Sequence, residues 1–134
     1  WIQNLRVPCE LENAEFQVVL DRRTKQDYDV CRAGWVGDYS DPMTFVECLA
    51  SWSEFNRGKW VNEEYDELIR TAQSTMDNEV RMNAMKEAEK IAFADEMAVA
   101  PLYFKKQNWA ISENVSGYFK PVNRYVLLYY ADIA

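Results

Sequence analysis

The sequence predicts an α/β fold, and three observations lead to this prediction. Residues 7–11 and 27–33 have the apolar patterns of strands, and a segment with helical spacing lies between them. Three further segments, between residues 41 and 95, combine helical spacing with residues that cap helices. Runs of residues that favour strands then follow at 98–111 and 125–130. This order of elements is typical of the α/β and α+β classes.

The first third of the chain carries the pattern of a βαβ unit. Val7, Cys9 and Leu11 alternate with polar residues, as in a half-buried strand. Asn13 is expected to cap the helix that follows, and residues 27–33 to form the second strand. We expect the two strands to be parallel, with a right-handed crossover. The side of the helix expected to face the sheet contains Phe16, Val19, Leu20 and Arg23.

Each of the three following helices has a residue suited to its N-cap. Asp41 stands before Pro42, and proline is favoured at the first helical position. Asn62 and Asp77 are suited to begin the other two helices. Four acids are expected on the solvent faces, namely Asp66, Glu67, Glu87 and Glu89. The residues expected to face the core are Met43, Val46, Leu49 and Ala50, then Tyr65, Leu68, Ile69 and Ala72, then Val80, Ala84, Ala88 and Ile91.

Length and composition limit the possible functions. The 134 residues suffice for one ordinary domain, and the net charge of −7 disfavours nucleic acid or an anionic membrane as a partner. The chain has no histidine, and Cys9, Cys31 and Cys48 lie far apart without a CxxC pair, so we expect no metal or other cofactor. At least one thiol is free or pairs outside the chain, and a Cys9–Cys31 bridge is left open. Because the sequence begins at Trp1, within what resembles the end of a helix, we expect it to be a piece of a larger protein.

The segment at residues 29–42 is the candidate ligand site. It runs from the second predicted strand through a turn with two glycines, Gly34 and Gly37, into a helix. In α/β proteins, ligand sites lie at such junctions, outside the ends of the strands. The glycines would let the backbone approach another group closely.

Three side chains of this segment could recognise a ligand with both charges. The carboxylate of Asp38 could receive a primary amine, the guanidinium of Arg32 suits a carboxylate, and Trp35 could stack on the ligand. Each also has a structural alternative: a turn cap for Asp38, an ion pair with a nearby acid for Arg32, and core packing for Trp35. Asp41 is better explained as a helix cap. Two acids without a histidine or a nucleophile motif are a weak basis for catalysis, so we expect no enzyme.

Several blocks of the sequence, in unbroken order, resemble the family 5 extracellular solute-binding proteins. These are the oligopeptide- and dipeptide-binding receptors of ABC importers, and the similarity is greatest to the oligopeptide-binding branch. The blocks are FQVVLDR at 16–22, DYDV at 27–30, RAGW at 32–35, GDYSDP at 37–42, GKWVNEEYDELI at 58–69, MKEAEKI at 85–91 and VAPLY at 99–103.

The resemblance implies the C-terminal portion of a two-lobed clamshell, the periplasmic-binding-protein type II fold. Residues 1–104 would belong to the second lobe, and residues 105–134 would cross the hinge back to the first lobe, whose bulk is missing. An ABC permease would be the partner, and the location would be extracytoplasmic, in the periplasm or lipid-anchored on the outer face of the membrane. The receptor would bury a peptide between its closing lobes.

The resemblance also assigns roles at the candidate site. The residue that meets the α-ammonium group of the peptide corresponds to Asp38, and the arginine that can meet the C-terminal carboxylate corresponds to Arg32. The backbone at Gly34 and Val36 would border the peptide, next to Trp35. Two other interpretations are kept: the same scaffold binding a nickel chelate, haem or an oligosaccharide, and a domain that self-associates through its bare surface.

Overall fold

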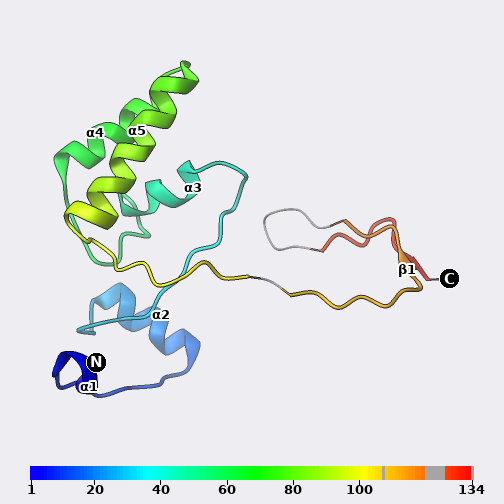
Figure 1. Ribbon diagram of the computed structural model, residues 1–134, viewed down its shortest axis with the longest axis horizontal. Coiled ribbons are helices and arrows are strands. Elements are labelled where there is room, and N and C mark those ends of the chain that lie inside the picture. The colour runs from blue at the N-terminus through cyan, green and yellow to red at the C-terminus, as the bar shows by residue number, and fades with distance from the viewer. Residues whose placement is uncertain (107, 120–125, 134) are drawn as a thin grey trace. The chain divides into compact units, whose positions relative to one another are not determined.

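The computed structural model describes residues 1–106, 108–119 and 126–133, and its chain divides into two compact units at residues 1–32 and 33–134 (Figure 1). Each unit is described by itself. None of the helices in the described ranges is long and apolar enough to cross a membrane.

The first unit contains two helices, α1 at Ile2–Leu5 and α2 at Phe16–Lys25. The cap of α2 differs from the prediction, because Glu15 rather than Asn13 accepts a hydrogen bond, from the backbone N–H of Gln17 at 2.9 Å. The helix ends at Gln26, whose φ of 58° is left-handed.

The two strands predicted for this unit are wrong. Residues 7–11 and 27–33 are described throughout, and neither segment forms a strand. Leu11 is 92% exposed and Val30 is 71% exposed. A strand is stabilised by a hydrogen-bonded neighbour, and an alternating sequence does not supply that neighbour.

The second unit begins with a helical body. Its elements are α3 at Met43–Val46, the 3₁₀ turn η1 at Glu47–Leu49, α4 at Glu63–Ser74, α5 at Asn78–Lys90 and the π-helical turn η2 at Ile91–Asp95. Helices α4 and α5 lie side by side (Figure 1). Two predicted caps are confirmed: Asn62 accepts from the N–H of Tyr65 at 2.8 Å, and Asp77 accepts from the N–H of Glu79 at 2.8 Å.

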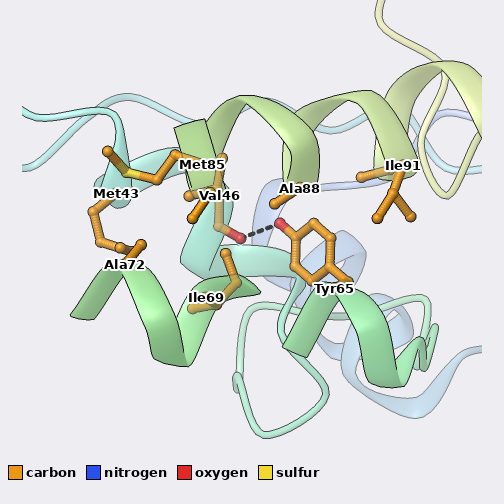
Figure 2. Packing of buried hydrophobic residues seen from close by; sticks show 10 residues of the cluster. Met43, Val46, Tyr65, Ile69, Ala72, Met85, Ala88 and Ile91 are labelled. Atoms are coloured by element: carbon orange, nitrogen blue, oxygen red, sulfur yellow. Dashed lines mark hydrogen bonds between the residues drawn. The ribbon is translucent and has the colours of Figure 1, made fainter. Parts of the chain in front are cut away.

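The hydrophobic core lies where α3, α4 and α5 meet (Figure 2). The hydroxyl of Tyr65 donates a hydrogen bond to the carbonyl oxygen of Val46, so its polar end is satisfied inside the core. Val80 is not part of this core, contrary to the prediction, because it lies in the first turn of α5, beside the loop from α4, and is 45% exposed. The core residues are Met43, Val46, Tyr65, Ile69, Ala72, Ala84, Met85, Ala88, Ile91 and Ala92.

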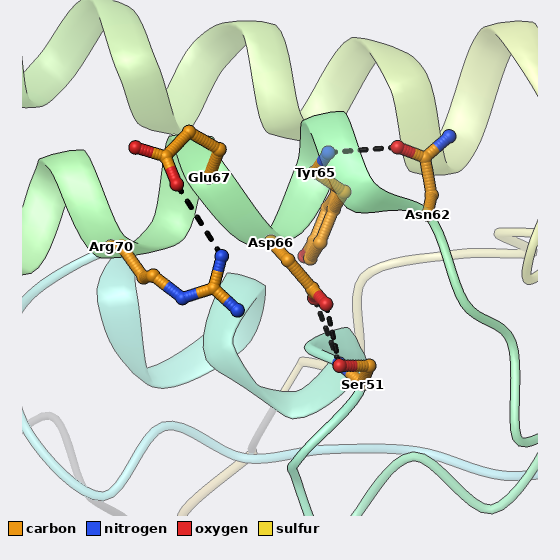
Figure 3. A network of polar contacts seen from close by, with 6 residues as sticks. All are labelled: Ser51, Asn62, Tyr65, Asp66, Glu67 and Arg70. Carbon is orange, nitrogen blue, oxygen red and sulfur yellow. Dashed lines mark hydrogen bonds and ion pairs between the residues drawn. The ribbon is translucent and has the colours of Figure 1, made fainter.

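Asp66 corrects another expectation. It was predicted on the solvent face of α4, but it is only 5% exposed, because Ser51 covers it (Figure 3). Its carboxylate accepts hydrogen bonds from the backbone N–H of Ser51, at 2.9 Å, and from the hydroxyl of the same residue. Glu67 lies on the exposed face as predicted, and Arg70 contacts it at 3.4 Å.

The last part of the second unit is a small antiparallel ladder. Strands β1 at Val115–Ser116 and β2 at Asp132–Ile133 pair with each other, and Phe119 and Leu127 form an isolated bridge. The backbone of Gly117 has φ of +68°, and a Cβ there would lie 1.8 Å from the carbonyl oxygen of Tyr130, so only glycine fits.

The predicted extended run at 98–111 contains no strand in its described residues. In the predicted run at 125–130, Tyr125 lies outside the described residues. Of the rest of that run, Leu127 enters the isolated bridge.

Candidate ligand-binding site

The turn at residues 37–42 is packed against the start of α3. The backbone N–H of Asp38 donates to the hydroxyl of Thr44 at 3.1 Å, and Thr44 is 1% exposed. A Cβ on Gly37 would lie 3.0 Å from Cγ2 of Thr44 and 3.1 Å from Cζ of Phe45. The close approach expected of the glycines is therefore one that Gly37 makes to Thr44 and Phe45 of the same chain.

The other end of the turn is fixed by Asp41. Its Oδ1 accepts from the backbone N–H of Met43 at 2.8 Å, as a capping side chain does, but the N-cap of α3 is Pro42, one residue later than predicted. Arg81 of α5 donates two more hydrogen bonds to the same carboxylate, each 2.8 Å long. The Arg81 guanidinium and the bond from Met43 hold the pKa of Asp41 below its usual value, against the opposing effect of desolvation.

A third contact joins the turn to η1. The hydroxyl of Tyr39 donates to Oε1 of Glu47 at 2.8 Å. Partial burial, together with this bond, raises the pKa of Tyr39 to about 12. The turn is thus attached at three points, through Thr44, Asp41 and Tyr39.

An aromatic pair lies beside the turn. The rings of Trp35 and Phe55 are 4.5 Å apart between centroids, with 57° between their planes. Trp35 is 39% exposed and Phe55 is 52% exposed, so both keep an open face. An open hollow in the surface is formed by the turn itself and is lined by Gly37, Tyr39, Ser40, Asp41, Pro42 and Phe45.

The predicted site residues are distributed as follows. Asp38 is exposed, Val36 is half-buried, and a Cβ on Gly34 would meet no atom within 4 Å. These three and Trp35 belong to the second unit, whereas Arg32 is the last residue of the first unit and is exposed. The contact that sequence reasoning missed is Arg81, because 40 residues separate it from Asp41 and no local pattern joins them.

All three cysteines are free thiols in the structure. Burial, and then the negative charges of Glu47 and Asp38, raise the pKa of Cys48 to about 11. In the described residues, no group of three or more histidine, cysteine, aspartate or glutamate side chains could hold a metal ion.

The arrangement leaves a carboxylate exposed on a turn whose backbone is attached to the body. The turn is held at Thr44, Asp41 and Glu47, and it presents the Asp38 carboxylate at the surface. An ammonium group paired with an exposed carboxylate gains only about 0–1 kcal/mol. Tight binding would therefore need a second surface that closes over Asp38 and removes water from the pair.

Known proteins are similar to this chain in sequence and in fold, although no protein-family model matches the chain. The oligopeptide-binding protein OppA of Bacillus subtilis is 39% identical over 122 residues, which are 90% of this chain and 22% of OppA. The dipeptide-binding protein DppE of the same organism is 31% identical, over 96% of this chain and 24% of DppE. The chain thus spans less than a quarter of the length of these relatives.

A solved structure supports the same comparison. The substrate-binding domain of an oligopeptide ABC transporter from Bacillus anthracis str. Ames superposes with a TM-score of 0.80 at 26% identity. The match covers 91% of this chain and 24% of that one. The likeness confirms the predicted fold class, that of a partial α/β binding-protein fold.

Proposed function

We propose that this chain belongs to the family 5 extracellular solute-binding proteins and contributes the peptide-binding turn of a receptor that serves an ABC importer. The observation that carries the proposal is the Asp38 carboxylate, exposed on a turn that is fixed at three points. The relatives named as oligopeptide- and dipeptide-binding proteins support a peptide as the ligand.

In this proposal, Asp38 binds the α-ammonium group of a peptide. The peptide would lie along the backbone at Gly34 and Val36, in the manner of an added strand, with Trp35 as an apolar surface beside it. Arg32, at the end of the first unit, would meet the C-terminal carboxylate of the ligand.

Closure of a second lobe would make the charge pair strong. Removing one partner of a buried, hydrogen-bonded ion pair costs about 3–5 kcal/mol, whereas an exposed pair contributes about 0–1 kcal/mol. Residues 1–104 would belong to one lobe and residues 105–134 would lead across the hinge to the other. Two apolar side chains near that transition are exposed, Leu102 to 73% and Phe104 fully. Exposed apolar side chains of this kind support contact with a surface of the other lobe.

The receptor would act as a binding protein and not as an enzyme. It would work outside the cytoplasm, in the periplasm or anchored by lipid on the outer face of the membrane, and would deliver peptides to a permease. The names of the relatives, which describe binding, support this role.

The test is Asp38→Asn in the complete receptor that carries this chain, with alanine peptides of two to five residues titrated by calorimetry. We expect affinity to fall by roughly two to four decades, the equivalent of about 3–5 kcal/mol. Glu67→Gln is the matched control, because it removes one negative charge from an exposed face of α4 and should leave affinity unchanged.

Unaltered affinity in Asp38→Asn would refute the anchor role. Binding of an oligosaccharide, haem or a nickel chelate, without binding of any alanine peptide, would instead assign the scaffold to another solute. Self-association of the chain that blocks peptide binding would favour the interaction-domain interpretation.

A further inference from the structure

The contact between Arg81 and Asp41 joins two segments that are distant in the sequence. Arg81 lies in the first turn of α5, and Asp41 ends the turn that contains Asp38. Both terminal nitrogens of the guanidinium donate, to both carboxylate oxygens, at 2.8 Å. The side chains are 25% and 30% exposed, so the pair is largely shielded from water. A bidentate pair of this kind fixes direction as well as distance.

The pair differs from the other ion pairs of α5 and its neighbours. The bonds of Lys90 to Glu87 and Asp95, and of Arg70 to Glu67, join residues three to five apart, and their side chains are more than half exposed. Such pairs contribute little and fix no loop. The Arg81–Asp41 pair instead ties a loop to a helix whose other face is part of the core.

The turn that carries Asp38 is held at both ends, and Tyr39 within it also bonds to Glu47 of η1. At one end its backbone N–H is bonded to Thr44, and at the other Asp41 is held by Met43 and by Arg81. The bonds to Thr44 and Met43 attach the turn to α3 alone, which is a helix of only four residues. Arg81 attaches it to α5, which has thirteen residues.

We propose that Arg81 is a positioning residue for ligand capture: by clasping Asp41 it holds the turn in the conformation that directs the Asp38 carboxylate at the amino terminus of a peptide. This inference rests on the proposed function of Asp38. Its physical basis is pre-organisation, because a turn that is already fixed loses less conformational freedom when the ligand binds.

Removal of Arg81 should change the affinity for a free amino terminus in opposite directions under a positioning role and under a purely electrostatic one. Arg81 carries a positive charge, and its removal near Asp38 would by charge alone strengthen the binding of an ammonium group. The positioning role predicts the opposite, a weaker preference for a free amino terminus. Lys in place of Arg keeps the charge but loses the planar two-point contact, so it should share the defect.

The experiment compares alanine peptides with their N-acetylated forms, in the complete receptor that carries this chain. The measured quantity is the affinity for the free peptide divided by the affinity for its N-acetylated form. A general loss of folded protein lowers both apparent affinities and leaves this ratio unchanged. We expect Arg81→Gln and Arg81→Lys to lower this ratio by about tenfold. Lys90→Gln is the matched control: it removes a positive charge from the same helix and should not change the ratio.

Asp38→Asn distinguishes the two levels of the proposal. If it leaves the ratio unchanged, the proposed function fails and the inference fails with it. If Asp38→Asn brings the ratio close to one while Arg81→Gln retains the ratio of the unmodified receptor, only the positioning role is overturned. A higher affinity for the free peptide in Arg81→Gln would also overturn it.

Discussion

The helical body at residues 43–95 and the first unit at residues 1–32 bury their apolar side chains to very different extents. In the body, Tyr65, Ile69 and Ala88 have no exposed surface. In the first unit, Leu11 is 92% exposed and Phe16 is 71% exposed. Both regions carry apolar patterns that predict buried faces, so a pattern of this kind does not by itself ensure burial.

The difference lies in where the partner surface comes from. Each helix of the body finds its partner within the same body, as α4 does in α5. Helices with short connections can do so because the two faces meet without a distant segment. The strands predicted in the first unit have no hydrogen-bonded neighbour in the described residues, so their apolar side chains stay exposed. The turn that carries Asp38 is attached to the body, which contains the buried core.

The largest effect we expect is on the free energy of unfolding, and one isoleucine-to-alanine substitution in each region should show it. Ile69→Ala opens a cavity between α4 and α5, and we expect it to lower the free energy of unfolding by about 2–5 kcal/mol. Ile2→Ala removes the same atoms from a side chain that is 59% exposed, and should change it by about 0.5 kcal/mol or less. Urea unfolding followed by the helical circular dichroism signal measures both. Equal losses would mean that the first unit is covered in solution.

A smaller effect is expected at the buried acid of α4. Asp66→Ala leaves the backbone N–H of Ser51 without its acceptor, and should lower the free energy of unfolding by about 1–3 kcal/mol. Glu67→Gln, at the next position on the exposed face, should change it by about 1 kcal/mol at most. The same urea titration compares the two. A neutral Asp66→Ala variant would show that the loop at residues 51–59 does not rest on α4.

Sequence reasoning succeeded where the physical cause is local. Asn62 and Asp77 cap their helices because each side chain bonds to an N–H two or three residues ahead. The apolar faces of α4 and α5 follow from helical spacing in the same way. Asp41 makes the bond expected of a cap, to the N–H of Met43, although the N-cap of α3 is one residue later, at Pro42.

It failed where the cause lies far along the chain. Asp66 is buried because Ser51 reaches it from 15 residues away, and Asp41 is clasped by Arg81 from 40 residues away. Neither contact leaves a mark in the local pattern of charges. The predicted strands failed for a related reason, since pairing depends on a neighbour that the alternating pattern does not identify. The roles of Asp38 and Arg32 toward a ligand stay predictions.

The last effect we expect is a difference in thiol reactivity between the two regions. Cys9, in the first unit, is exposed, whereas the pKa of Cys48, in the body, is raised to about 11 by burial and by the charges of Glu47 and Asp38. The thiolate is the reactive form, so a rise from 9.0 to about 11 leaves roughly a hundredfold less of it at pH 8. Iodoacetamide should therefore alkylate Cys9 well before Cys48, as mass spectrometry of the digested chain would show.

The pH dependence and one variant sharpen this last test. The alkylation rate of Cys48 should keep rising with pH up to about 11, because the thiol loses its proton only there. Asp38→Asn removes one of the negative charges that raise this pKa, and should speed alkylation of Cys48 by a few-fold at most, since Asp38 is the weakest of the three causes. Urea should abolish the difference between Cys9 and Cys48 by unfolding the body. If Cys48 reacted as fast as Cys9 in the folded chain, the burial of Cys48 in the helical body would be contradicted.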